Sequence, residues 1–208
     1  MPVSYNIQAE IVDIRTDTPK PIDEFLVDTN VWFWMTYSRA SLGDNPPCHY
    51  QVTHYPTYIS NALNYQSKLY RCGLSLAELA HIIERNEKEI YNKSNVPLKP
   101  KEYRHNLPQE RKGVVSQIEV AWKQVKGLAR SIEGLIIDET STDHVMANMA
   151  SQLLDGYDLF ILDSINKTGI IKVITDDGDY TSVPNIQIFT ANRNVIDAAR
   201  TQGKLISR

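Results

Sequence analysis

The sequence predicts an α/β protein in which a central parallel sheet carries helices on both faces. Short apolar runs that stop at polar residues alternate with stretches of helical periodicity along most of the chain. Strands that alternate with helices in this way are typical of a parallel sheet. The 208 residues, of which 42% are hydrophobic and 23% charged, suffice for one sizeable core. We therefore expect one domain over residues 23–208, preceded by an N-terminal arm over residues 1–22.

The first third of the chain contains two of the expected strands. Residues 4–14 alternate with the period of a strand, and the arm could be either an added edge strand or a partner-binding segment. The first core strand covers about 24–28 and runs into a helix, which a loop over 43–47 follows. A second helix is expected over 57–66, with Pro56 near its start.

The remaining two thirds of the chain begin with a buried strand over 68–74 and a helix that opens at Ser75. Residues 85–113 are rich in Lys and Arg and are interrupted by prolines, so we interpret them as a basic, partly irregular insertion. Apolar spacing then predicts alternating helices and strands, and glycines after two of the helices are expected to cap them. These are a helix over 108–131, a strand over 135–137, a helix over 142–154 capped by Gly156, a buried helix from Asp158, strands over 170–175 and 186–189, and a helix over 192–202 capped by Gly203.

Composition narrows the class of protein. The net charge of −3 means that any nucleic-acid binding must come from a local basic face. Cys48 and Cys72 are not spaced as metal ligands, which favours reduced thiols in the cytoplasm. The sequence starts without a signal-peptide pattern, and no apolar run approaches the roughly 18 residues of a membrane span. We therefore expect a cytoplasmic protein without a membrane partner.

Acidic residues stand at comparable places in four of these elements. Asp28 ends the first core strand and Asp177 follows a later one, while Glu78 and Asp158 lie in the first turn of a helix. Each has an ordinary structural explanation. Asp28 and Asp158 could stabilise the N-terminus of a helix, Glu78 could form a capping box with Ser75, and the acids around Asp177 could belong to a turn.

Taken together, the four acids predict a metal site. The carboxyl ends of parallel strands share one edge of a sheet, so these side chains can converge there. Carboxylates held close to one another repel unless a cation lies between them. Mg²⁺ and Mn²⁺ take oxygen ligands, and such ions can stabilise the attacking and leaving oxygens of a phosphodiester.

The same stretches resemble the four acidic motifs of the PIN domain family. They are Phe25-Leu26-Val27-Asp28-Thr29-Asn30, Leu74-Ser75-Leu76-Ala77-Glu78-Leu79, Asp158 with its buried helix, and Val173-Ile174-Thr175-Asp176-Asp177-Gly178-Asp179-Tyr180. The similarity in order and spacing covers about residues 24–200. In the third motif, Asp155 and Asp163 compete with Asp158, which fits the family's spacing better.

The resemblance implies a Rossmann-like three-layer sandwich with a five-stranded parallel sheet of order 3-2-1-4-5. It also implies Mg²⁺- or Mn²⁺-dependent cleavage of single-stranded RNA, in bacterial relatives as the toxin of a toxin–antitoxin pair. An inhibitory antitoxin protein and a homodimer are then the expected partners. Asp28, Glu78, Asp158 and Asp177 would hold the ion or orient its waters, with Asp179 as an auxiliary ligand. Thr29, Asn30 and Thr175 would form hydrogen bonds to these ligands and to the substrate.

The chain is longer than the compact toxins of this family because of the basic segment over 85–113 and the N-terminal arm. Lys99, Lys101 and Arg104 of the basic segment could contact an RNA backbone, or the segment could be only a solvated charged face.

Two other functions remain open. A haloacid-dehalogenase-like phosphatase also has an aspartate at the end of its first strand, but it needs a second aspartate where this chain has Asn30, and it leaves Glu78 without a role. A catalytically idle PIN-like module that binds RNA or protein is the alternative that is not an enzyme.

Overall fold

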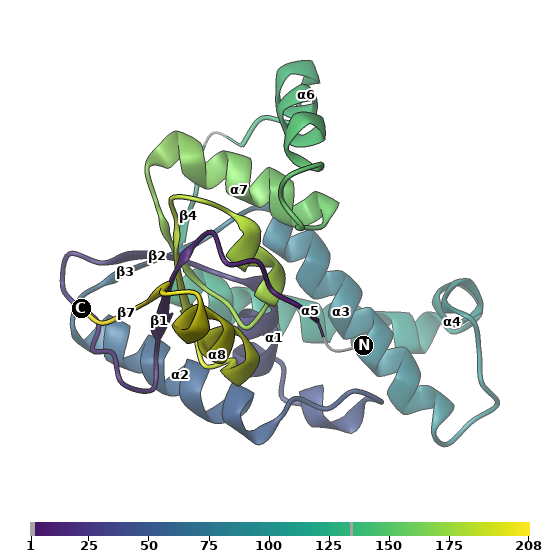
Figure 1. Ribbon diagram of the computed structural model, residues 1–208. Helices are drawn as coiled ribbons and strands as arrows, with labels where there is room; N and C mark the ends of the chain where they lie inside the picture. Colours follow the sequence, from purple (N-terminus) through teal and green to yellow (C-terminus); the bar gives the residue numbers. More distant parts are fainter. Residues whose placement is uncertain (1–2, 134) are drawn as a thin grey trace.

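A single parallel sheet forms the centre of the protein, in a computed structural model that describes residues 3–133 and 135–208 (Figure 1). Within these residues the sheet has seven strands in the order β4-β3-β2-β5-β6-β1-β7, and every neighbouring pair is parallel. The strands are β1 (Glu10–Asp13), β2 (Glu24–Val27), β3 (Lys68–Arg71), β4 (Arg130–Ser131), β5 (Lys172–Ile174), β6 (Gln187–Thr190) and β7 (Leu205–Ile206). The α/β class with a parallel sheet is therefore confirmed, whereas the expected number of five strands is wrong.

Helices cover both faces of the sheet. They are α1 (Thr29–Thr36), α2 (His49–Asn64), α3 (Leu74–Asn92), α4 (Pro100–Asn106), α5 (Pro108–Leu128), α6 (Glu139–Asn148), α7 (Gly156–Thr168) and α8 (Arg193–Thr201), with the short 3-10 helices η1 (Ala40–Leu42) and η2 (Gly178–Ser182). Successive strand residues point to opposite faces: Phe25 and Val27 pack with α1, α2, α3 and α5, whereas Leu26 packs with α7 and α8. No helix in the described parts of the chain is long and apolar enough to cross a membrane.

The N-terminal arm contributes an internal strand. β1 pairs with β6 on one side and with β7 on the other, so it is not the edge strand that its alternation allowed. Gln8 N and Ala9 N also donate hydrogen bonds to Thr181 O, at 2.8 and 3.1 Å. The arm is thus built into the sheet next to η2.

The expected strand over 135–137 is wrong, because β4 lies at Arg130 and Ser131 instead. Arg130 pairs with Tyr70 of β3, and Ile132 N donates to Arg71 O at 3.0 Å. Ile136 and Ile137 are 61% and 53% exposed, so the apolar run that indicated a strand does not enter the core. Consequently α5 ends at Leu128, before the strand, rather than at residue 131.

Three other boundaries differ from the expectation. α2 begins at His49 rather than at residue 57 and contains Pro56, because Gln51 and Cys48 form a capping box upstream. α6 covers 139–148, and Gly156 begins α7 instead of capping α6. Gly203 does adopt the left-handed conformation expected of it, with φ of 69°.

The basic segment over 85–113 is mostly helical, and the expected irregular part is confined largely to residues 93–99. It consists of the end of α3, the whole of α4 and the start of α5. Pro100 and Pro108 lie at the first positions of α4 and α5, where the missing N–H costs nothing, so these prolines start helices rather than interrupt them.

Candidate metal centre

The carboxyl edge of the sheet brings acidic side chains together from five elements. Asp28 follows β2 directly, Glu78 lies near the start of α3 after β3, and Asp177 follows β5. Asp155 and Asp158 lie at the start of α7. Asp179 of η2 completes the set, and the name acid cluster is used below for these six residues.

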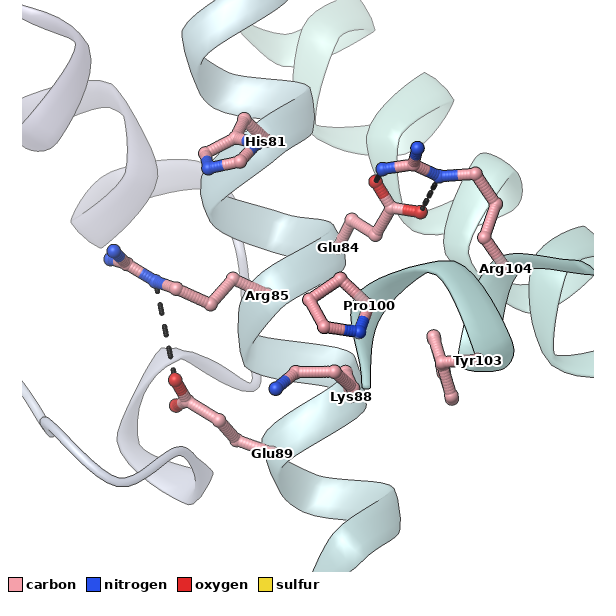
Figure 2. Close-up of a pocket in the computed structure, with 8 residues that line it drawn as sticks. All are labelled: His81, Glu84, Arg85, Lys88, Glu89, Pro100, Tyr103 and Arg104. Atoms are coloured by element: carbon pink, nitrogen blue, oxygen red, sulfur yellow. Dashed lines mark hydrogen bonds and ion pairs between the residues drawn. The ribbon is translucent and has the colours of Figure 1, made fainter. Parts of the chain in front are cut away.

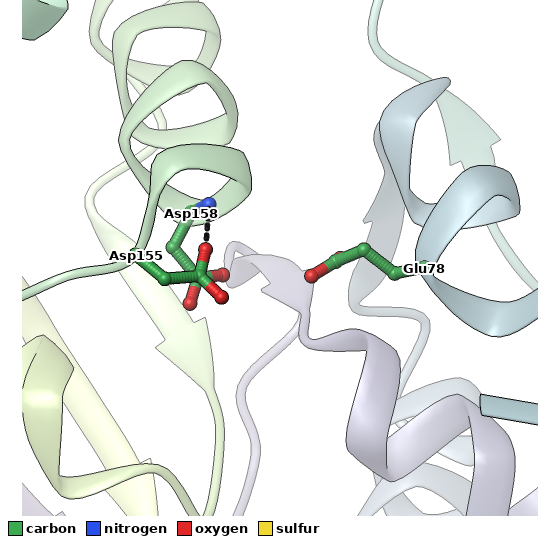
Figure 3. A group of neighbouring side chains, drawn as sticks. All are labelled: Glu78, Asp155 and Asp158. Carbon is green, nitrogen blue, oxygen red and sulfur yellow. Dashed lines mark hydrogen bonds between the residues drawn. The ribbon is translucent and has the colours of Figure 1, made fainter. Parts of the chain in front are cut away.

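Glu78, Asp155 and Asp158 form the most compact part of the acid cluster. Each offers a carboxylate oxygen within 4.8 Å of the others. Figure 3 shows Glu78 pointing from α3 toward the two aspartates at the start of α7. Such a set of three oxygen donors fits a hard divalent cation such as Mg²⁺ or Mn²⁺.

Hydroxyl groups from neighbouring elements hold three of the acids. Thr175 donates to Asp28 at 2.7 Å and Thr29 donates to Glu78 at 2.6 Å. Tyr180 donates to Asp158 at 2.7 Å. These bonds orient the carboxylates without neutralising their charge. Thr29 and Thr175 therefore contact two of the acids, and their role toward a metal or substrate stays a prediction.

The ordinary capping explanations do not account for these acids. Asp28 occupies the N-cap position of α1, but its carboxylate forms no capping bond and instead accepts from Thr175 Oγ1, which follows the neighbouring strand β5. Glu78 bonds Thr29 rather than the amide of Ser75. The helix containing Asp158 is capped by Asp155, which accepts from Tyr157 N at 2.9 Å and from Asp158 N at 3.1 Å.

The turn explanation holds in part for Asp177. Its carboxylate accepts from Asp179 N at 2.8 Å and so caps η2. Its own amide donates to Thr175 Oγ1 at 2.9 Å, and that hydroxyl in turn donates to Asp28. Thr175, which is fully buried, therefore links the two acids that follow β2 and β5.

Burial and mutual repulsion raise the pKa of five of the six acids. Burial, opposed by the bond from Thr175 but reinforced by Asp177 and Glu78, raises the pKa of Asp28 to about 7. Burial and the charge of Asp28 raise the pKa of Asp158 to about 9. For Glu78, Asp177 and Asp179 the pKa is also raised, mainly by burial, and Asp155 contributes repulsion in each case. The fold thus holds carboxyl groups where their ionised forms are unfavourable.

The acid cluster lacks a cationic partner within the described protein. Among residues 3–133 and 135–208, none of its six carboxylates forms an ion pair with a lysine, arginine or histidine. Acids elsewhere in the protein do have such partners, for example Glu84 with Arg104 and Glu87 with Arg39. The charge at this edge is therefore uncompensated, which favours an added cation.

Asp155 is the member of the cluster that sequence reasoning set aside. The expected cap at Gly156 obscured its position, since Asp155 is in fact the N-cap residue of α7. An aspartate three residues before another at a helix start is the pattern that could have identified it. Asp163, the other rival, contacts Lys167 at 2.7 Å and His144 at 3.7 Å, outside the cluster.

Two further side chains lie close to the loop after β5. The ring of Tyr5 from the N-terminal arm covers Gly178, where a Cβ would lie 2.2 Å from Tyr5 Cε1, so only glycine fits between Asp177 and Asp179. Asp176 accepts hydrogen bonds from Tyr50, Gln51 and Tyr55 of α2, at 2.6–2.8 Å. Tyr5 therefore borders the cluster, whereas Asp176 attaches α2 to the loop.

The expected RNA-binding residues lie apart from the acid cluster. Lys99 precedes α4, and Lys101 and Arg104 belong to it, at the far end of α3 from the start of α7 (Figure 1). Arg104 forms two hydrogen bonds to Glu84, at 2.7 and 2.6 Å. Asn30 is half-buried in the first turn of α1, next to Thr29.

The arrangement offers several oxygen donors, hydroxyl groups that fix them, and the first turn of α1 directly after Asp28. Backbone amides at the start of a helix attract anions such as phosphate. The edge can therefore hold a divalent cation and an anionic ligand side by side.

No protein-family model matches this sequence, and a search of curated proteins likewise finds no match.

Proposed function

We propose that this chain is a Mg²⁺- or Mn²⁺-dependent ribonuclease of the PIN-domain type, which hydrolyses phosphodiester bonds in single-stranded RNA. The observation that carries the proposal is the acid cluster, with its raised pKa values and no cationic partner within the described residues. The order β4-β3-β2-β5-β6 within the sheet also supports it, because it equals the order 3-2-1-4-5 that the resemblance implies. A toxin role with an antitoxin partner stays a prediction.

The acids divide into two roles. Glu78, Asp155 and Asp158 would hold the cation, since their oxygens already converge. Asp28 and Asp177, linked through Thr175, would complete the ligand set or orient water for attack on the phosphorus. When bound, Mg²⁺ or Mn²⁺ stabilises the negative charge that develops on the phosphodiester oxygens. Asn30 and the first amides of α1 would bind the substrate phosphate.

Cleavage of labelled single-stranded RNA tests the proposal. The wild-type protein should cleave it with Mn²⁺ or Mg²⁺ but not with chelator, and Asp28→Asn or Asp177→Asn should lower the rate by at least a hundredfold. Asp163→Asn serves as the matched control, because this acid lies on α7 but contacts Lys167 and His144 instead of the cluster. Cleavage that persists in chelator, or in Asp28→Asn, would contradict the proposal. Hydrolysis of a phosphomonoester without cleavage of RNA would favour the phosphatase.

A further inference from the structure

A cavity of about 190 Å³ lies between α3 and α4, on the side of α3 that also carries Glu78 (Figure 2). Glu78 is followed on α3 by His81, Arg85 and Lys88, at spacings of three, seven and ten residues. At 100° per residue these positions share one face of the helix. With a rise of 1.5 Å per residue, Arg85 and Lys88 lie about 10–15 Å along the helix from the acid cluster.

The lining combines a small apolar part with a rim of three cations and two glutamates, Glu84 and Glu89. Pro100 supplies the accessible apolar surface, whereas Tyr103 is only 2% exposed and packs against Tyr91 with ring centroids 5.5 Å apart. Arg85, Lys88 and Arg104 supply the basic part, as Figure 2 shows. Such a combination of apolar surface and cations suits a ligand that has a flat ring and a phosphate.

Part of the basic charge is free to bind an anion. Arg104 is engaged with Glu84 at 2.6 Å, but Glu84 also contacts Arg111 at 3.2 Å, so two guanidinium groups share one carboxylate. Arg85 Nε and Glu89 Oε1 are 4.0 Å apart, which is the limit of an ion pair, and the Arg85 side chain is 58% exposed. Lys88 forms no ion pair with any residue that the structure describes. Lys88 and Arg85 are therefore the cations best placed for a phosphate.

We propose that this cavity binds one nucleotide of the single-stranded RNA substrate, away from the bond that is cleaved. The nucleobase lies against Pro100, and its phosphate contacts Lys88 and Arg85. The cavity is smaller than the roughly 300–1,000 Å³ of sites for drug-sized molecules, so it accepts a single base rather than a larger ligand. The inference rests on the proposed ribonuclease function, since it assumes that an RNA strand runs along α3 from the acid cluster.

Binding of a fluorescent single-stranded oligoribonucleotide in chelator, over a series of salt concentrations, tests the cavity without cleavage. Arg85→Ala with Lys88→Ala should weaken binding about tenfold. The slope of log K against log salt should become shallower by about 0.7, because the contact with one phosphate of a single strand is lost. Lys123→Ala with Lys126→Ala is the matched control, since both lysines are exposed on α5. It should keep the slope and lose less than threefold in affinity.

Cleavage with Mn²⁺ separates the cavity from the acid cluster. A dinucleotide cannot extend from the cluster to the cavity, so wild type and Arg85→Ala with Lys88→Ala should cleave it equally, while the double variant should cleave the long strand more slowly. If the double variant bound and cleaved the long strand like wild type, the cavity would not be a nucleotide site. If wild type cleaved neither substrate but the double variant still lost binding, the ribonuclease proposal would fail and the RNA site would stand.

Discussion

Each of the three acids with a hydroxyl partner is held by an element other than its own. Thr175 after β5 holds Asp28, Thr29 of α1 holds Glu78, and Tyr180 of η2 holds Asp158. A neutral donor fixes the direction of a carboxylate but leaves its charge available to a cation. An arginine or lysine in the same place would neutralise the acid and weaken its affinity for metal. The hydroxyl partners therefore order the carboxyl groups and leave them available to a cation.

Asp28→Asn should stabilise the protein in chelator. The pKa of Asp28 in the folded protein is about 7, above that of an unfolded aspartate, so its ionisation lowers the free energy of unfolding as the pH rises from about 4 through 7. Asparagine keeps the shape and removes the charge. At pH 8 we expect a gain of about 2 kcal/mol, or roughly 4–8 °C in melting temperature for a chain of this length.

Added metal should make the wild-type protein melt at a higher temperature than Asp28→Asn, which is the reverse of their order in chelator. A ligand that binds only the folded state adds about 2.7 kcal/mol at a hundredfold excess over its Kd, and Asp28→Asn should gain less of it than wild type. Melting curves with chelator and with Mn²⁺ measure both effects, and Asp163→Asn should respond to Mn²⁺ like wild type. The metal site would be disproved if Mn²⁺ moved neither curve and the substitution did not stabilise the protein in chelator.

At the scale of elements, two neighbouring aspartates have different roles: one attaches a helix to the loop, and the other belongs to the acid cluster. Asp176 faces α2 and accepts from Tyr50, Gln51 and Tyr55, whereas Asp177 belongs to the acid cluster. Tyr55 is fully buried, and its hydroxyl oxygen also lies 3.1 Å from Thr175 O. The contacts of α2 thus reach the residue that links Asp28 to Asp177. Packing of α2 against the loop after β5 therefore supports the geometry of the acid cluster on the opposite side of that loop.

Asp176→Ala should destabilise the protein while leaving its response to metal intact. Loss of a charged acceptor from three donors should cost about 2–3 kcal/mol, which corresponds to roughly 4–12 °C in melting temperature. Asp177→Ala should show the opposite pattern, with little change in chelator and a smaller shift on addition of Mn²⁺. These separate roles of Asp176 and Asp177 would be wrong if Asp176→Ala left the stability in chelator unchanged but abolished the rise in melting temperature on addition of Mn²⁺.

At the scale of the whole molecule, Arg208 joins segments from both ends of the chain. Its guanidinium contacts Asp17 and Asp23, each at 2.8 Å, and lies 4.5 Å from the ring centroid of Phe189. Lys172 of β5 also contacts Asp23, which is fully buried. Through these contacts, the connection between β1 and β2 is bound to β5, β6 and the residues after β7.

This network should make stability depend on acid pH. Burial alone would raise the pKa of Asp23, but hydrogen bonds from Arg208 and Lys172 outweigh it and lower the pKa to about 2. Because the folded-state pKa lies below the unfolded value, this stabilisation is present above about pH 4 and is lost as the pH falls through 2. Denaturant titrations from pH 7 to pH 2 should show that loss.

Arg208→Ala should lower the free energy of unfolding at pH 7 by about 2–3 kcal/mol and make its decline in acid shallower. Arg200→Ala is the control, because Arg200 and Asp197 form an exposed pair of little expected effect. Equal effects of the two substitutions would show that the contacts of Arg208 with Asp23 and Asp17 do not stabilise the fold.

Local patterns in the sequence determined the α/β class, four of the strands, and the places of Asp28, Glu78, Asp158 and Asp177. An apolar run that stops at an acid is a signal contained within a few residues, and parallel strands necessarily end at a common edge. The same reasoning failed at residues 135–137 and at Gly156, where an apolar run and a glycine each have more than one structural meaning.

Only the tertiary structure decided which side chains meet. β1 pairs with β6 and β7, which lie more than 170 residues further along the chain, and no local periodicity records such pairing. Membership of Asp155 in the acid cluster depends on how α7 packs beside α3, and the partner of each carboxylate depends on which hydroxyl the next layer presents. Sequence patterns specify elements and the faces they bury, whereas distances between side chains of different elements arise only when those faces pack together.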